Sequence, residues 1–213
     1  MPHHYFIAGT DTGVGKTYIA AHLLKSLHEP NHTVGYIKPF QTGCGNVGGM
    51  LASPDVEAVK GLLGKDVECH VLHSFELPAC PYFAALKTKT RIDLCEAVEW
   101  AKSLTRMYAA SVIEAAGGLM VPLTWNETIL DFAAAVAFPV ILVAANRLGC
   151  INHSLLSLHV LKERGIEIRA LVLNDIEPVI DDEVAESNAE MIMAFAPDIE
   201  IIRVNHGGDF TLI

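Results

Sequence analysis

The sequence predicts an α/β fold in three layers, with a mainly parallel sheet of about seven strands and helices on both faces. Short apolar runs rich in β-branched residues alternate with longer segments of helical periodicity, which is typical of a parallel sheet. The apolar runs are continuous, which indicates strands that are buried on both faces. Because 213 residues suffice for one sizeable core, we expect a single domain over 1–213.

The expected elements follow one another in a regular order. Strands are expected at the apolar runs 5–8, 33–38, 110–115, 139–145, 168–174 and, more weakly, 199–204. Helices are expected between them at 16–28, 55–63, 92–107, 151–164 and 182–195. The segment "IDLCEAVEWAKSLTRM" has the clearest 3.6-residue rhythm, and Pro39 is expected to end the second strand. Ligands of such sheets bind at the carboxyl ends of the strands, where the polar motifs of this chain fall.

Composition excludes several classes of protein. A formal charge of −10 argues against a nucleic-acid surface, which needs a basic stripe. The longest apolar run, 132–145, is interrupted by Pro139 and is shorter than the roughly 20 residues of a membrane span. The N-terminus lacks the features of a signal peptide, so we expect a cytoplasmic protein. The five cysteines form no C-x-x-C pair and the histidines are scattered, which disfavours disulfides and zinc and favours small-molecule chemistry.

The stretch "FIAGTDTGVGKTYIA" reads as a strand, a glycine-rich loop and the start of a helix. Backbone N–H groups of such a loop bind phosphate, a lysine neutralises it, and the following hydroxyl binds Mg²⁺. In the usual pattern G-x-x-x-x-G-K-[ST] the first glycine would stand at Thr10, whereas this chain has Gly9 one residue earlier. The alternative is a glycine-rich turn with an incidental lysine. We expect ATP to be bound by Gly13, Val14, Gly15, Lys16, Thr17 and Tyr18.

A second polar motif, "GYIKPFQTG", follows the second expected strand. Lys38 at the strand end would point its ammonium into the same crevice as the phosphate loop. The alternative is an ordinary solvated lysine. Thr42 adds a hydroxyl, and Gly43 a turn residue.

A third motif, "SVIEAAGGLMVPL", places Glu114 at the end of an otherwise apolar strand. A carboxylate is costly to bury unless it is paired or binds a metal. Together with Thr17 and with Asp55, which lies at an expected helix start, Glu114 could bind Mg²⁺ beside phosphate oxygens. The competing role for Asp55 is helix capping, and both roles are compatible.

A fourth motif, "NRLGCINHSLL", follows the strand that contains "VILVAAN". A helix that starts here leaves free N–H groups at residues 149–152, which favours an anion. The helix stripe of Leu155, Leu158, His159 and Lys162 fits a subunit interface or, equally well, an ordinary core face with a wet edge.

In this order and over roughly residues 5–176, the motifs "GTDTGVGKT", "GYIKPFQTG", "IEAAGGLMVPL", "NRLGCINHSLLSLHVLKERG" and "LVLNDI" resemble the dethiobiotin synthetase family. The resemblance implies a P-loop NTPase-like fold and a Mg²⁺- and ATP-dependent ring closure. In that reaction 7,8-diaminopelargonate takes up CO2 as a carbamate, ATP activates it as a carbamic-phosphoric anhydride, and the second amine closes the ureido ring. ADP and phosphate are released.

The resemblance also assigns residues to roles. It implies that Lys16 and Lys38 are catalytic and that Thr17, Asp55 and Glu114 hold the metal. It adds to the ATP site Asp55, Glu114, Ala115, Ala116, Gly117 and Asn174, with Asn174 reading the adenine edge. At the C-terminal end, where this chain departs from the family, we expect Asn205, His206 and Gly207 to contact the base with backbone groups. It forms the substrate site from Thr12, Lys38 and Thr42 of one chain and from Gly149, Cys150, Ile151 and Asn152 of the other chain of a homodimer.

Three positions depart from the family pattern or lack a role. Ala115 stands where the family commonly has glycine, and we expect its methyl group to be accommodated. The end of the chain, "VNHGGDFTLI", differs from the proline-containing loop that the family often has beside the base. Gln41 has no role that the sequence assigns.

Three other classes of protein remain as alternatives. A ParA-like ATPase switch typically has a second lysine early in its phosphate loop, whereas this chain has "AGTDTG" there. A glutamine-dependent amidoligase of the cobyrinate type carries a long glutaminase domain, for which 213 residues leave no room. A nucleotide-binding module without chemistry is the third. For this chain we expect neither nucleic acid nor membrane as a partner.

Overall fold

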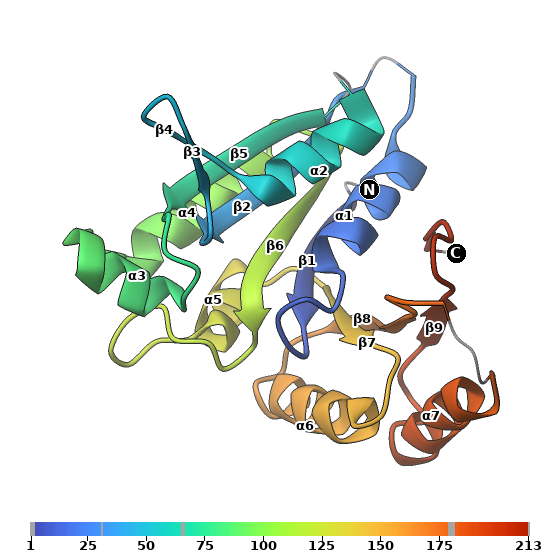
Figure 1. Cartoon of the computed structure of the whole chain (residues 1–213). Helices are drawn as coiled ribbons and strands as arrows, with labels where there is room; N and C mark the ends of the chain where they lie inside the picture. Colours follow the sequence, from blue (N-terminus) through green and yellow to red (C-terminus); the bar gives the residue numbers. More distant parts are fainter. Residues whose placement is uncertain (1–2, 31, 65–66, 179–181, 213) are drawn as a thin grey trace.

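A computed structural model of the chain describes residues 3–30, 32–64, 67–178 and 182–212. In these residues a 7-stranded sheet has the order β5-β2-β6-β1-β7-β8-β9, and all its pairings are parallel. Helices lie on both faces of the sheet (Figure 1). The predicted three-layer α/β class and the parallel sheet are therefore confirmed.

The strands of the sheet are β1 His3–Gly9, β2 Val34–Gln41, β5 Val67–Ser74, β6 Ala110–Gly118, β7 Val140–Ala145, β8 Ile168–Asn174 and β9 Ile201–Val204. A separate antiparallel hairpin consists of β3 Gly45–Val47 and β4 Met50–Ala52. The helices are α1 Lys16–Leu27, α2 Pro54–Leu63, α3 Pro81–Thr88, α4 Leu94–Thr105, α5 Ile129–Val136, α6 Cys150–Glu163 and α7 Asp182–Phe195. Within the described ranges, no helix is both long and apolar enough to cross a membrane.

The two faces of the sheet bury two separate apolar cores. One core packs α1 against alternate strand residues such as Ile7, Tyr36 and Val143, and the C-terminal Phe210 closes it. The other packs α4, α5, α6 and α7 against the residues that point the opposite way, such as Phe6 and Leu142. Successive strand residues point to opposite faces, so a strand that serves both cores must be apolar throughout. This explains why the central strands appear in the sequence as continuous apolar runs.

Several elements are absent from the sequence prediction. The strand β5 lies at the edge of the sheet, pairs with β2 alone and has mostly half-buried side chains, so it carries no continuous apolar run. The helices α3 and α5 have 8 residues each, too few for a clear 3.6-residue period. The hairpin strands have 3 residues each. The predicted helix 182–195 agrees with α7, and the other predicted helices differ by one or two residues at their ends.

The expectation that Pro39 ends the second strand is wrong, because β2 continues to Gln41. Pairing of β2 with β6 stops at Ile37, opposite Ile113. Pairing with β5 continues through Lys38 and Phe40. The missing N–H group of Pro39 therefore interrupts no ladder on the β6 side.

Candidate active site

The phosphate loop joins β1 to α1 at the carboxyl edge of the sheet (Figure 1). Gly15 precedes α1 with φ 92, a left-handed conformation. A Cβ atom at Gly15 would lie 2.1 Å from the Asn174 Nδ2 atom. Asn174 Nδ2 in turn donates to the Val14 carbonyl oxygen at 3.0 Å. Glycine is therefore required at position 15, and Asn174 at the end of β8 supports the loop from below.

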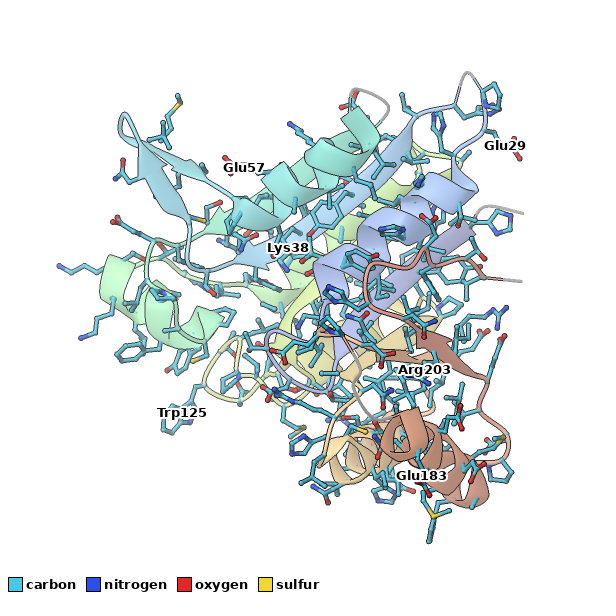
Figure 2. All side chains as sticks on the ribbon, turned by 45° about the vertical axis from the view of Figure 1, so that its right-hand side comes forward. Glu29, Lys38, Glu57, Trp125, Glu183 and Arg203 are labelled. Carbon is cyan, nitrogen blue, oxygen red and sulfur yellow. The ribbon has the colours of Figure 1, made fainter. Side chains whose placement is uncertain are left out.

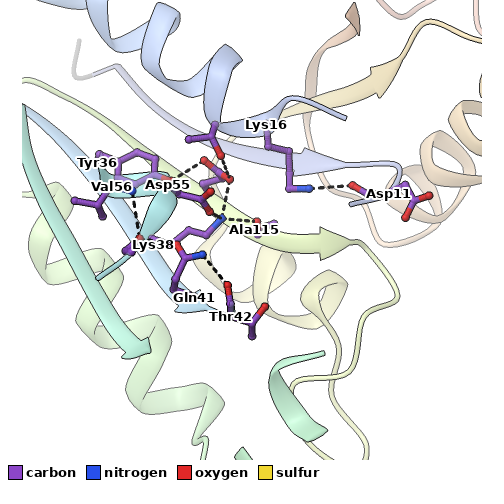
Figure 3. Close-up of polar contacts among 12 residues, drawn as sticks. Asp11, Lys16, Tyr36, Lys38, Gln41, Thr42, Asp55, Val56 and Ala115 are labelled. Atoms are coloured by element: carbon purple, nitrogen blue, oxygen red, sulfur yellow. Dashed lines mark hydrogen bonds and ion pairs between the residues drawn. The ribbon is translucent and has the colours of Figure 1, made fainter. Parts of the chain in front are cut away.

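Lys16 is the first residue of α1 and is buried. Its Nζ atom donates to the Asp11 carbonyl oxygen at 2.9 Å, across the loop (Figure 3). Burial lowers the pKa of Lys16 to about 8, although Glu114 partly opposes this shift. An anion on the loop would favour the charged lysine, which is the behaviour that phosphate binding requires.

Lys38 lies between two carboxylates (Figure 3). Its Nζ atom is 2.7 Å from Asp55 Oδ2 and 2.7 Å from Glu114 Oε1, and it donates to the Ala115 carbonyl oxygen at 3.2 Å. Lys38 is 3% exposed and Glu114 is 1% exposed. Figure 2 shows Lys38 near the middle of the molecule, whereas Trp125, 87% exposed, projects from the surface. The alternative of a solvated lysine is therefore wrong.

The charges of this cluster support one another. Burial alone would lower the pKa of Lys38, but the charges of Glu114 and Asp55 outweigh burial and raise it. Burial alone would raise the pKa of Asp55, but Lys38 outweighs burial and lowers it, with the side chains of Thr17 and Gln41 also favouring the charged form. Lysine and aspartate are both held in their charged forms.

Glu114 is fixed by hydrogen bonds at both of its carboxylate oxygens. Tyr36 donates its phenolic hydrogen to Oε2 at 2.7 Å. Thr17 donates to Oε1 at 3.0 Å, the oxygen that also faces Lys38. Burial and the charge of Glu114 raise the pKa of Tyr36 well above its ordinary value, so the phenol keeps the proton that it donates. Tyr36 and Lys38 are two residues apart in β2 and therefore reach the same face of the sheet.

A cleft of about 640 Å³ opens over this cluster. Of the residues predicted from the sequence, it brings together Thr12, Gly13, Gly15, Lys16, Thr17, Lys38, Thr42, Asp55, Glu114, Ala116 and Gly117. Its remaining lining residues are Phe40, Gln41, Pro54, Pro78, Ala79, Cys80, Pro81 and Val121. The cleft is thus bounded by the phosphate loop, the ends of β2 and β6, the start of α2 and the loop before α3.

The start of α2 settles which residue caps that helix. Ser53 is the N-cap, and its Oγ atom accepts from the Val56 backbone N–H at 3.2 Å. Asp55 lies in the first turn and pairs with Lys38 instead. The capping role considered for Asp55 therefore belongs to Ser53, which leaves the Asp55 carboxylate to the cleft.

The Ala115 methyl group is accommodated away from the cleft. Ala115 is 2% exposed and belongs to the core on the α4–α6 side, whereas Ala116 and Gly117 line the cleft. The extra carbon of alanine, where the family commonly has glycine, thus packs with apolar neighbours.

The start of α6 lies on the other side of the phosphate loop. None of Gly149, Cys150, Ile151 and Asn152 lines the main cleft of its own chain, and Cys150 borders a separate cavity of about 350 Å³ beside Thr10 and Asp11. Of the helix stripe considered above, Leu158 is 2% exposed in the core of its own chain, and Leu155 packs against that core. These two leucines form a core face of α6, and they are not available to an interface.

The residues predicted near the base lie in two places. Asn174 is buried at the end of β8 under the phosphate loop, as described above. Asn205, His206 and Gly207 form an exposed turn directly after β9. Tyr18 connects this turn to α1, because its phenol donates to the Gly208 carbonyl oxygen at 2.6 Å. Val14, Tyr18 and Asn174 therefore do not line the main cleft, and Val14 instead lines the separate cavity of about 350 Å³.

Sequence reasoning missed the contribution of Tyr36 and of the loop at 78–81. Tyr36 reads as one more apolar residue of a strand, and only its spacing of two from Lys38 could have indicated a shared face. The 78–81 segment, "PACP", precedes a helix that the periodicity did not reveal.

The oxygen donors of the cluster match the requirements of Mg²⁺. Thr17, Asp55 and Glu114 offer one hydroxyl and two carboxylates around a point where the Lys38 ammonium now provides positive charge. Mg²⁺ in phosphate sites is bound by one or two carboxylates together with phosphate and water oxygens. Thr17, Asp55 and Glu114 are therefore the residues that would hold Mg²⁺ in this cleft.

A phosphate loop with its lysine, together with one carboxylate on β6 and one in the first turn of α2, defines the class of P-loop nucleotide-binding proteins. The fold agrees: a ParA family ATPase from Chlorobium tepidum TLS superposes with a TM-score of 0.63 at 12% identity, covering 97% of this chain and 85% of that chain. At that identity the likeness concerns the fold alone.

Comparison of sequences gives the family. A family model described as "AAA domain" matches residues 3–203. An ATP-dependent dethiobiotin synthetase from Anaeromyxobacter dehalogenans (strain 2CP-C) is 38% identical, over 87% of this chain and 82% of that protein. One from Akkermansia muciniphila is 32% identical over 97% of this chain and 94% of that protein. The chain belongs to this AAA-domain family and to the dethiobiotin synthetase family.

Proposed function

We propose that this protein is an ATP-dependent dethiobiotin synthase, a ligase that forms carbon–nitrogen bonds. Its substrates are 7,8-diaminopelargonate, CO2 or bicarbonate, and ATP. The observation that supports this most directly is the buried Lys38 ammonium held by Asp55 and Glu114 beside the phosphate loop, in a cleft of about 640 Å³. A second basic group so close to Lys16 suits a reaction in which two anionic groups must meet.

The first step forms a carbamate. One amine nitrogen of the diamine attacks CO2 and loses a proton, which leaves a carboxylate on that nitrogen. Lys38 stabilises this new negative charge, and the hydroxyl groups of Thr12 and Thr42 on the walls of the cleft hold the amine and carbamate by hydrogen bonds. Residues 13–17 meanwhile bind the ATP phosphates through backbone N–H groups at the start of α1.

The second step transfers the γ-phosphoryl group. A carbamate oxygen attacks the γ-phosphorus, the bond to the β-phosphate oxygen breaks, and ADP leaves. Lys16 and Lys38 stabilise the charge that develops on the phosphoryl oxygens. Mg²⁺, when bound by Thr17, Asp55 and Glu114, supplies further positive charge to the phosphates.

The third step closes the ring. The second amine nitrogen attacks the carbonyl carbon of the carbamic-phosphoric anhydride and loses a proton, and phosphate leaves with the bonding electrons. The protein contributes mainly by positioning, because the anhydride is already activated. The apolar walls at Phe40 and Val121 keep water away from this intermediate.

The proposal includes a homodimer with shared substrate sites. The carboxylate at the far end of the diamine needs its own anion site, which the first turn of α6 of a second chain, Gly149–Asn152, would offer through its N–H groups. The N–H of Cys150 is excepted, because it donates to the Arg147 carbonyl oxygen at 3.0 Å. Near this helix start Leu148 is 94% exposed and Leu156 is 57% exposed, so apolar surface is available there to a partner. In this proposal the exposed face of α6 contacts the second chain, because Leu155 and Leu158 are packed in the core of their own chain.

The proposal also includes the base site and the location in the cell. Asn174 and the turn Asn205–Gly207 follow neighbouring strands, β8 and β9, which suits contacts with adenine. A cytoplasmic location fits an ATP-consuming enzyme with five free cysteines, because a reducing compartment keeps thiols unpaired.

The test is substrate-dependent ATP consumption. Purified protein should release ADP and phosphate only when both 7,8-diaminopelargonate and bicarbonate are present, with one dethiobiotin formed per ATP. ATP hydrolysis that is independent of the diamine would favour a ParA-like switch. Nucleotide binding without any hydrolysis would favour a module without chemistry.

A further inference from the structure

Gln41, at the carboxyl end of β2, uses both ends of its side-chain amide. Its Nε2 atom donates to the Thr42 carbonyl oxygen at 3.0 Å. Its Oε1 atom accepts from the Ser53 hydroxyl at 2.6 Å. The residue is 4% exposed and lines the cleft. A buried amide that is satisfied at both ends is costly to replace by a group lacking either function.

The bond to Ser53 connects two separate elements. Ser53 is the N-cap of α2 and accepts from Val56 N–H while it donates to Gln41. Gln41 therefore ties the start of α2 to the end of β2. Without this tie, the first turn of α2 would be held at the cleft only by the polar contacts of the Asp55 carboxylate itself, among the described residues, with Lys38, Thr17 and Gln41.

The position of α2 matters because Asp55 lies only two residues after Ser53. Asp55 Oδ2 is 2.7 Å from Lys38 Nζ, on the side of the cleft that faces Glu114. The Asp55 side chain is 25% exposed, so packing alone does not fix its direction. The Gln41–Ser53 bond restricts the first turn of α2 and with it the direction of this carboxylate (Figure 3).

We propose that Gln41 is a positioning residue that holds the Asp55 carboxylate toward the cation position shared with Thr17 and Glu114. It acts through Ser53 and the first turn of α2. The inference rests on the proposed function only in its assumption that a metal–nucleotide complex binds in this cleft. Partners that orient metal ligands in this way typically contribute 10- to 100-fold, order-of-magnitude, to metal affinity.

The experiment measures metal affinity rather than turnover. Mn²⁺, which is visible by electron paramagnetic resonance, is titrated into the protein saturated with adenylyl imidodiphosphate, an ATP analogue that is not hydrolysed. We expect Gln41→Met, which keeps the length of the side chain and removes the amide, to weaken Mn²⁺ binding about tenfold. Binding of the analogue without metal should stay within about twofold of the wild type, because the phosphate loop is untouched.

The matched control is Asn188→Leu. Asn188 is a buried amide on α7 that donates to Asn146 Oδ1 at 3.0 Å, away from the residues that line the cleft. The Asn188→Leu substitution removes a comparable buried hydrogen bond. This variant should therefore have a lower melting temperature than the wild type and an unchanged Mn²⁺ affinity. Equal Mn²⁺ affinities for Gln41→Met and the wild type would overturn the role of Gln41, and so would equal losses in Gln41→Met and Asn188→Leu.

The outcomes separate this inference from the proposed reaction. If the wild type binds Mn²⁺ with the analogue but makes no dethiobiotin, the proposed reaction is refuted, and the Mn²⁺ affinities of Gln41→Met and the wild type can still be compared. A wild type that binds no Mn²⁺ in this complex overturns the inference. If Gln41→Met does not fold, Ser53→Ala removes the same bond from the other end, and unchanged Mn²⁺ affinity in that variant overturns the inference as well.

Discussion

Replacing Lys38 by methionine tests whether its ammonium occupies the cation position of the cleft. The substitution keeps an unbranched side chain and removes the ammonium that lies 2.7 Å from both Asp55 and Glu114. Breaking a buried ion pair by removing one partner costs about 3–5 kcal/mol. We expect the lower end, because Asp55 is 25% exposed and Glu114 keeps its bonds from Tyr36 and Thr17.

The expected loss of stability is measurable as a decrease in the melting temperature. For a chain of this size 1 kcal/mol corresponds to about 2–4 °C, so Lys38→Met should melt about 6–12 °C below the wild type. MgCl2 without nucleotide should raise the melting temperature of Lys38→Met more than that of the wild type, because the variant has lost the ammonium that lies between its two carboxylates. Turnover at saturating substrates should fall by about 10² or more.

The control is Lys162→Met. Lys162 also forms an ion pair at 2.7 Å, with Asp198, but its side chain is 40% exposed. Exposed pairs contribute about 0–1 kcal/mol, so this variant should melt close to the wild type. The reasoning is refuted if Lys38→Met melts like Lys162→Met, or if MgCl2 raises the melting temperatures of wild type and Lys38→Met equally. Near-normal turnover of Lys38→Met would remove Lys38 from catalysis.

Three further predictions concern the metal, the pH dependence of stability and the assembly. Glu114→Gln should raise the Mg²⁺ concentration for half-maximal activity by about tenfold, and an unchanged titration curve would remove Glu114 from the site. Burial alone would raise the pKa of Asp131, but hydrogen bonds from Thr128 outweigh burial and lower it, so this carboxylate stabilises the fold above its unfolded pKa. Asp131→Asn should therefore lower the free energy of unfolding by about 1 kcal/mol at neutral pH. This difference from the wild type should shrink as the pH falls through the lowered pKa of Asp131. A difference in unfolding free energy that does not depend on pH contradicts this prediction. The variants Lys38→Ala and Asn152→Glu should each be inactive alone. After the two are mixed and exchange subunits at random, they should recover about a quarter of wild-type activity, because half of the dimers then contain one intact site of two. A wild-type protein that sediments as a monomer with full activity would refute the shared site.

The sequence predicts the elements that are buried on both sides and misses those that are not. Central strands such as β7 must be apolar at every position, so they are visible as continuous runs. The edge strand β5 has one neighbour and carries His70 and His73 among its half-buried residues, which hides it. The helices α3 and α5 make about two turns each, and two turns give too few repeats for a period to be recognised.

Some residues of the site could likewise be predicted from the sequence, and others could not. Lys16 and Thr17 follow from a local motif, and the meeting of Lys38 with Glu114 follows once β2 and β6 are neighbours in the sheet. Gln41 could not be assigned from the sequence, because its role depends on Ser53, which lies 12 residues further along the chain and caps a helix. Such a contact between a strand end and a helix start leaves no periodic signal.

The fold alone does not identify the reaction of this protein. The ParA family ATPase shares the fold at a TM-score of 0.63 with 12% identity, so the sheet and the phosphate loop alone do not select a reaction. In this protein a second lysine, Lys38, is buried on β2, the strand beside β6, and is held by Asp55 and Glu114. Burying that charge is costly, and stability alone would be served as well by apolar residues of similar size. The cost is understandable if the ammonium must meet an anionic substrate beside the phosphates, which is what the ring-closing reaction demands of this position.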